Sequence, residues 1–157
     1  ADDHEFHIEL RCNRLSKCVI ISSRVHPGES NASFIMEGFL DFIVSNEKEA
    51  KALRDTFVFK VVPMLNPDGV IVGNYRTSLA GLDLNRQWQT PDRQQAVEIH
   101  AMKQMIKKTL ECRQIQLFVD IHGHSRQNNL FMYGCTPDPP KTATGLQKNK
   151  VVSPALT

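Results

Sequence analysis

The sequence contains no hydrophobic segment that could cross a membrane, since no apolar run approaches the roughly 20 residues that a membrane helix needs. It also lacks a strong charge of either sign, because 19 basic and 17 acidic residues leave a formal net charge of +2. Such a balance argues against nucleic acid or an anionic membrane surface as a partner. The N-terminal stretch ADDHEFHIEL is acidic and has neither the basic nor the apolar region of a signal peptide.

Cysteine is scarce, and the four residues present form no C-x-x-C pair: Cys12, Cys18, Cys112 and Cys135. An even number would allow two disulfides, but nothing else in the sequence indicates a small, disulfide-stapled secreted domain. We therefore expect reduced thiols and a cytosolic protein. The 157 residues, 41% of them hydrophobic and 23% charged, are enough for one globular domain with its own core.

Apolar patterning predicts strands and helices that alternate along the chain, which indicates an α/β fold around a mostly parallel or mixed sheet. Strands are expected at 5–10, 18–25, 57–65, 115–123 and 130–134, with short strand-like pieces within 70–88. The segments 18–25, 115–123 and 130–134 are expected to be buried. Helices are expected at 30–45, 47–56 and 91–113.

Local signals set the expected ends of these elements. Ser30 or Asn31 is the expected cap of the first helix, and Pro91 lies near the expected start of the last one. The motif NPDG is typical of a turn that closes strand 57–65. Residues 136–157 show no periodicity and are expected to form a surface loop or insertion.

Polar motifs follow three of the expected strands: HPGE, NPDG and DIHGHS. In open α/β sheets, sites lie beyond the carboxyl ends of the strands. His26, Glu29 and His122 would then supply two imidazoles and one carboxylate, the donor set of a catalytic zinc site. Pro27 and Gly28 would let one tight turn aim His26 and Glu29 at the same point.

Each of these residues also has a plainer interpretation, because an isolated H-x-x-E often occurs by chance. His4, His7 and His100 are expected to be structural or solvated. His124 lies two residues after His122 and would share its face of a strand. We expect His124 to line the pocket or to support the ligands rather than bind metal.

A second polar group lies in the irregular stretch GNYRTSLAGLDLNRQW. Arg76, Asn85 and Arg86 could clamp a substrate carboxylate, since a guanidinium binds both carboxylate oxygens. Without a metal site nearby they would be ordinary loop residues. Asp68 and Asp83 are expected in turns or in contact with the site residues.

Three ordered motifs, HPGESNAS, PMLNPDGVIVGNYRTSLAGLDLNRQW and DIHGHSRQNNLFMYG, resemble the M14 zinc metallocarboxypeptidases, most of all their cytosolic carboxypeptidase branch. The resemblance covers about residues 18–135 and implies an α/β/α sandwich around a mixed sheet. It implies one zinc held by His26, Glu29 and His122. It further implies an oxyanion-stabilising role for Arg76 and a substrate-carboxylate role for Asn85 and Arg86.

The same resemblance implies substrates and location. Members of this branch remove glutamates from protein C-termini or side-chain polyglutamates, so the expected partners are acidic tails such as those of tubulin. The expected location is the cytosol, and association with microtubules is expected there.

One departure concerns the general base, which in this family is a glutamate late in the catalytic domain, accompanied by a late tyrosine. No glutamate follows Glu111, and no tyrosine follows Tyr133. Asp120 is expected to support His122 rather than replace that base. The chain is therefore expected to be the N-terminal part of a catalytic domain and to be inactive by itself. Two alternatives stay open: a non-catalytic module that binds zinc or peptide carboxylates, and an interaction protein with a relic metal set.

Overall fold

The computed structural model describes residues 17–134 and 150–152. The predicted strand 5–10, His4, His7, Cys12, Cys135 and most of the predicted loop 136–157 lie outside these ranges. The chain divides into two compact units, residues 1–123 and 124–157, which are treated separately below.

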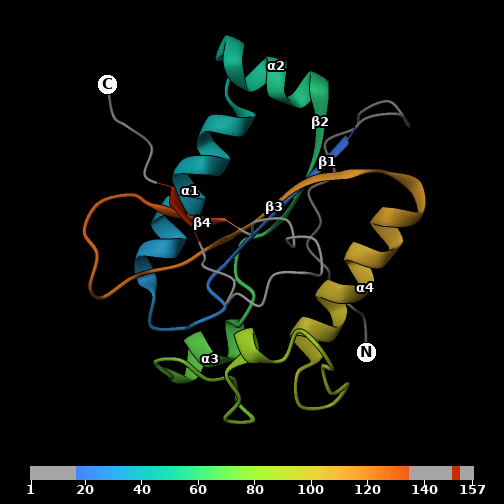
Figure 1. Ribbon diagram of the computed structural model, residues 1–157. Helices are drawn as coiled ribbons and strands as arrows, with labels where there is room; N and C mark the ends of the chain where they lie inside the picture. Colours follow the sequence, from blue (N-terminus) through green and yellow to red (C-terminus); the bar gives the residue numbers. More distant parts are fainter. Residues whose placement is uncertain (1–16, 135–149, 153–157) are drawn as a thin grey trace, which may run out of the picture. The chain divides into compact units, whose positions relative to one another are not determined.

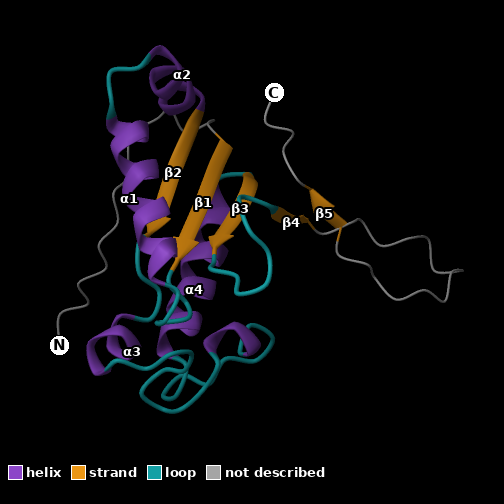
Figure 2. Ribbon diagram, turned by 90° about the vertical axis from the view of Figure 1, so that its left-hand side faces the viewer, coloured by secondary structure: helices purple, strands orange, loops and turns teal. Residues whose placement is uncertain are grey.

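The first unit is built on a parallel three-stranded sheet in the order β2-β1-β3 (Figures 1 and 2). Its strands are β1 (Lys17–Ser23), β2 (Phe57–Val62) and β3 (Ile115–Ile121). The central strand β1 is apolar almost throughout and buried from its second residue on. This is the pattern of a parallel strand that is covered on both faces.

Helices cover both faces of the sheet, which gives three layers (Figure 1). The helices are α1 (Ser30–Val44), α2 (Lys48–Thr56), α3 (Pro67–Val72) and α4 (Val97–Cys112), with a 3-10 turn at Leu84–Arg86. Val19 and Ile21 of β1 pack with Met36 and Ile43 of α1.

Alternate residues of β1 point to the opposite face, as strand geometry requires. Cys18 and Ile20 belong to a second buried cluster with Ile99 and Met102 of α4. The predicted α/β/α class and the mostly parallel sheet are confirmed. No helix among the described residues is long and apolar enough to span a membrane.

Two strands that were expected to be buried are partly or largely exposed. The strand predicted at 115–123 is present as β3, but it is not buried: Leu117 is 48% and Phe118 41% exposed. Within the described sheet, β3 is an edge strand with β1 as its single neighbour, so its side chains have fewer packing partners.

The strand predicted at 130–134 is shorter and exposed. It forms β4 (Met132–Gly134), which pairs antiparallel with β5 (Lys150–Val152) in the second unit. The segment 150–152 lies within the stretch expected to form a surface loop or insertion, and it forms a strand there. Backbone pairing with β4, which apolar periodicity does not report, makes this short segment a strand.

The structure also differs from the predicted turn at NPDG and from the predicted start of the last helix. NPDG does not close a strand with a turn, because the Asn66 side chain accepts the Gly69 N–H and Pro67 begins α3. The strand-like piece at 70–72 is thus helical. The last helix begins at Val97 rather than near Pro91, because the Asp92 side chain accepts two backbone N–H groups and holds a separate turn.

Candidate metal centre

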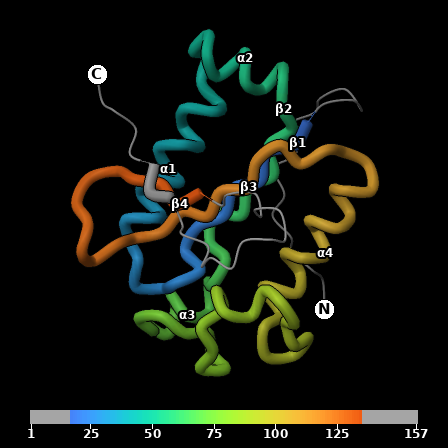
Figure 3. The backbone as a smooth tube through the Cα atoms, viewed as in Figure 1, coloured from blue at the N-terminus to red at the C-terminus, as the bar shows by residue number. Residues whose placement is uncertain are grey.

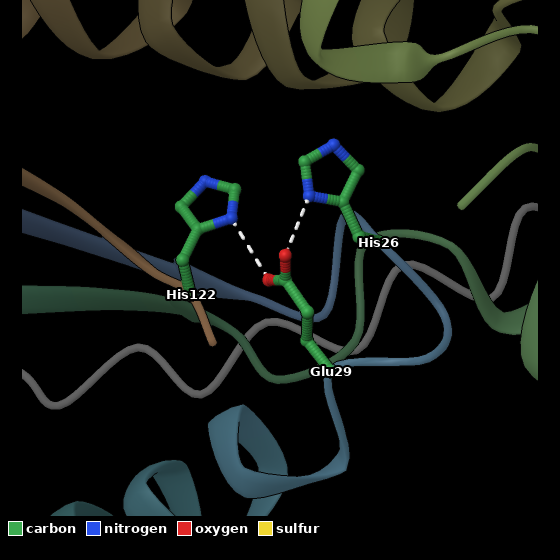
Figure 4. A group of neighbouring side chains, drawn as sticks. All are labelled: His26, Glu29 and His122. Atoms are coloured by element: carbon green, nitrogen blue, oxygen red, sulfur yellow. Dashed lines mark hydrogen bonds and ion pairs between the residues drawn. The ribbon is translucent and has the colours of Figure 1, made fainter. Parts of the chain in front are cut away.

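Three potential metal ligands converge where the parallel strands β1 and β3 end. His26 and Glu29 lie in the turn between β1 and α1, which the blue trace of Figure 3 follows, and His122 comes directly after β3. One donor atom from each residue lies within 4.8 Å of the others (Figure 4). The convergence predicted from the HPGE and DIHG motifs is therefore present.

The carboxylate of Glu29 lies between the two imidazoles. His26 Nδ1 is 3.0 Å from one carboxylate oxygen, and His122 Nδ1 is 2.9 Å from the other (Figure 4). The backbone N–H of Gly123 donates to the second oxygen at 2.8 Å. Burial acts to raise the pKa of Glu29, but these hydrogen bonds and the histidine charges outweigh it and hold the pKa below its usual value.

Glu29 also occupies the N-cap position of α1, where the sequence predicted Ser30 or Asn31. Its side chain makes no capping hydrogen bond. The predicted cap is wrong because the helix already begins at Ser30, and the cap residue directs its carboxylate to the histidines instead.

The second nitrogen of each imidazole contacts an aspartate. His26 Nε2 is 3.1 Å from Asp83 Oδ1, and His122 Nε2 is 2.7 Å from Asp120 Oδ2. Asp120 in turn accepts the hydroxyl of Ser22 at 2.8 Å. Hydrogen bonds to Asp120 and then to Glu29 raise the pKa of His122 to about 9.

These contacts fit a zinc site. Metal-binding histidines usually donate their other ring N–H to a carboxylate, which fixes the ring and its tautomer. Here the Nε2 atom of each histidine contacts an aspartate. Both Nδ1 atoms face the Glu29 carboxylate and are the candidate metal-binding atoms. The expected supporting contact of Asp120 with His122 is present.

Asp83 connects this centre to the predicted substrate-binding loop. Its second oxygen accepts Arg76 Nε at 2.8 Å, and its first accepts the backbone N–H of Asn85 at 3.0 Å. Burial acts to raise the pKa of Asp83, but the hydrogen bonds from His26 and Arg76 outweigh it and lower the pKa. Arg86 ends the 3-10 turn and is exposed.

Three further predictions concern residues outside the donor cluster. His124 is exposed in the second unit, where its Nδ1 accepts the backbone N–H groups of Arg126 and Gln127 and its ring contacts Phe131. His100 lies half-buried on α4, and Asp68 is exposed in the first turn of α3.

Several contacts at the centre were not predicted. The backbone N–H of Gly123 binds Glu29, and the N–H of Gly28 donates to the carbonyl of Tyr75 at 2.7 Å. A Cβ at Gly28 would lie 2.5 Å from the Tyr75 ring and 2.7 Å from that carbonyl oxygen. Glycines beside ligand motifs are the sequence signal for such close approaches. Cys18 is buried and Cys112 is exposed.

A comparison with family models matches residues 8–153 to the zinc carboxypeptidase model, Peptidase_M14. Cytosolic carboxypeptidase 2 of Mus musculus is 63% identical over 119 residues, which cover 76% of this chain and 14% of the mouse protein. The chain thus spans about a seventh of the length of that relative.

Solved structures show the same likeness. A metallo-carboxypeptidase from Burkholderia cenocepacia is 37% identical with a TM-score of 0.65, covering 69% of this chain and 29% of its own. A metallo-carboxypeptidase from Pseudomonas aeruginosa, solved in complex with (2-guanidinoethylmercapto)succinic acid, is 33% identical with a TM-score of 0.64, covering 70% and 28%. The family match, the fold and the converging donor set together lead to one conclusion: the chain belongs to the zinc carboxypeptidase family.

Proposed function

We propose that this chain is the N-terminal part of the catalytic domain of a zinc-dependent metallocarboxypeptidase, which hydrolyses the last peptide bond of protein or peptide substrates. One observation carries the proposal. His26, Glu29 and His122 converge at the strand ends, and each imidazole is backed by an aspartate. A carboxylate on the second ring nitrogen of each histidine is the usual arrangement of histidines that bind a metal.

In this proposal His26, Glu29 and His122 hold one zinc ion. Zinc in such a site supplies Lewis acidity toward a carbonyl oxygen and toward water. Arg76 would stabilise negative charge that develops on the carbonyl oxygen. Asp83 contacts both Arg76 and His26, and so holds Arg76 near the metal ligands.

The carboxylate clamp would consist of Asn85 and Arg86, which follow Asp83 on one 3-10 turn. Trp88 Nε1 donates to Asn85 Oδ1 at 3.0 Å. An indole N–H can only donate, so this contact fixes the oxygen and leaves the amide nitrogen of Asn85 available to a substrate carboxylate. Binding of the terminal carboxylate would select cleavage at the chain end.

The proposed substrates are glutamate-ended chains, such as acidic protein tails and those of tubulin, and the proposed location is the cytosol. The name of the mouse relative, a cytosolic carboxypeptidase, supports the location. The compound bound by the Pseudomonas protein combines a succinic acid with a guanidinoethyl group, so it supports a carboxylate-binding site but not a preference for glutamate side chains.

A non-catalytic zinc or carboxylate-binding module is the second candidate. Three carboxylates belong to the described centre, Glu29, Asp83 and Asp120, and each is already hydrogen-bonded to a histidine. This favours a module that binds without hydrolysis unless another segment supplies a base. In the third candidate, a relic metal set, zinc would not bind.

Hydrolysis by the full-length protein distinguishes these candidates. We expect zinc-dependent release of glutamate from a peptide with a free terminal carboxylate and little release from the same peptide amidated at its C-terminus. His26→Ala, assayed in parallel, controls for contaminating peptidases. Zinc binding without release would favour the non-catalytic module, and absence of stoichiometric zinc would favour the relic.

A further inference from the structure

Arg24 links β1 to the turn that carries two of the three candidate ligands. Its φ angle is 57°, in the left-handed region that non-glycine residues seldom adopt. Ser23 and Val25 are tied down on either side of it. The Ser23 carbonyl accepts the Leu65 N–H at 2.9 Å, and the Val25 carbonyl accepts Asn66 Nδ2 at 3.2 Å. The chain is thus held in an unfavourable conformation two residues before His26.

The side chain of Arg24 joins the ligand turn to α1. Its Nε donates to the carbonyl of Pro27 at 2.8 Å, and its Nη1 donates to the hydroxyl of Ser33. Pro27 lies between His26 and Glu29, while Ser33 lies in the first turn of α1. One guanidinium therefore fixes the turn relative to the helix that begins after Glu29.

The turn has weak support of its own. Its internal backbone bond, from the Glu29 N–H to the His26 carbonyl, is 3.2 Å long. The Glu29 side chain gives α1 no capping bond, because it lies between the histidines. Inside the turn His26 Nδ1 also contacts the Glu29 carboxylate at 3.0 Å, and from outside the turn is fixed by Arg24 and by the Gly28 N–H bond to the Tyr75 carbonyl.

We propose that Arg24 is a positioning residue for the metal centre, which sets the spacing of the His26 and Glu29 donors through its two hydrogen bonds. The inference rests on the proposed zinc site. By electrostatics alone, removing the positive charge of Arg24 should strengthen the binding of a dication. If Arg24 positions the ligands, loss of its two hydrogen bonds should instead weaken zinc binding.

Zinc affinity of the full-length protein, measured by competition with a chromophoric chelator, tests the proposal. Arg24→Gly relieves the backbone conformation and removes both bonds, so zinc affinity should fall about 10- to 100-fold. Arg24→Lys keeps the charge but lacks the planar fork, so it should also lose affinity. The absorption of the cobalt-substituted protein should change in both variants, since it reports the ligand geometry.

Arg54 provides a matched control, because its Nη1 also donates to backbone carbonyls of the α1 region, those of Ile43 and Ser45. Arg54→Gly should lower thermal stability and leave zinc affinity unchanged. If Arg24→Gly prevents folding, Ser33→Ala removes one acceptor alone and should lower zinc affinity about tenfold.

The outcomes separate this inference from the zinc assignment. If His26→Ala binds zinc as tightly as the unmodified protein, the metal site itself is misassigned. If His26→Ala loses zinc while the Arg24 variants, or Ser33→Ala in their place, bind zinc with unchanged or higher affinity, Arg24 has no positioning role.

Discussion

His122 carries a proton that a metal ion must displace. Its hydrogen bonds to Asp120 and then Glu29 raise its pKa to about 9, so in the metal-free protein the imidazole is charged at neutral pH. This protonation stabilises the metal-free fold below the unfolded pKa of about 6.5. The stabilisation is lost as the pH rises toward 9.

Zinc binding should show the opposite trend, because the metal needs the neutral imidazole. We expect apparent zinc affinity to rise about tenfold per pH unit as the pH rises toward about 9 and to level off above it, with about one proton released per zinc near pH 7. Isothermal titration calorimetry in buffers of different ionisation enthalpy measures that proton release.

Asp120→Asn is the matched variant for this prediction. It removes the largest contribution to the raised pKa of His122, so the pH range of steep zinc affinity should move to lower values. An unchanged profile would mean that Asp120 does not control this proton.

Gly28 is required because it has no side chain. A Cβ at this position would overlap the ring and carbonyl of Tyr75, which precedes Arg76. Gly28→Ala should lower the free energy of unfolding by about 1–3 kcal/mol and separate the Arg76 loop from the ligand turn. Peptidase activity should then fall as well.

Gly38 is its control, because a Cβ there meets no atom within 4 Å in the interior of α1. Gly38→Ala should raise stability by about 0.5–1 kcal/mol and leave activity unchanged. Denaturant unfolding curves of both variants check the pair. Equal stabilities would show that the loop yields to accommodate the added methyl group.

At the scale of elements, the loop that ends in the 3-10 turn combines two proposed tasks. Arg76→Ala should mainly lower kcat, because carbonyl oxyanion charge develops only near the transition state. Arg86→Lys keeps its charge but loses the bidentate fork, so KM for a free C-terminus should rise. Steady-state kinetics of the full-length protein with a glutamate-ended peptide separates the two effects. A rise in KM alone for Arg76→Ala would reverse the assigned roles.

The elements that the sequence predicted well are those with long apolar patterns. The buried run of β1 and the spacing of α1 depend on burial against neighbours that are present in the fold. These patterns also place HPGE and DIHG at the ends of parallel strands. That placement brings His26, Glu29 and His122 to the same edge of the sheet.

The predictions failed where short polar contacts outweigh the apolar pattern. The Asn66 side chain accepts a backbone N–H, and a helix begins where a turn was expected. The Asp92 side chain accepts two backbone N–H groups, so α4 begins later in the sequence than expected. Arg24 likewise could not be found from composition, because its role depends on a backbone angle and two distant acceptors.

At the scale of the whole molecule, the described part of the chain presents a sheet edge that is open and apolar. Among the described residues β3 has a strand neighbour on one side only, and its Leu117 and Phe118 are 48% and 41% exposed. An open apolar edge of this kind favours association with other chains. We therefore expect these 157 residues, produced alone, to have low stability and to aggregate.

The last prediction is that the 157 residues alone bind zinc but have no peptidase activity. General-base catalysis requires a carboxylate that can take a proton within hydrogen-bond reach of the reacting water. Glu29 is a proposed ligand, and Asp83 and Asp120 are held by His26 and His122, so the described centre offers no uncommitted carboxylate. The zinc-loaded chain should therefore release no glutamate from glutamate-ended peptides, with His26→Ala as the contamination control. Zinc-dependent turnover near that of the full-length protein would contradict this, and would mean that one of these aspartates leaves its histidine to act as the base.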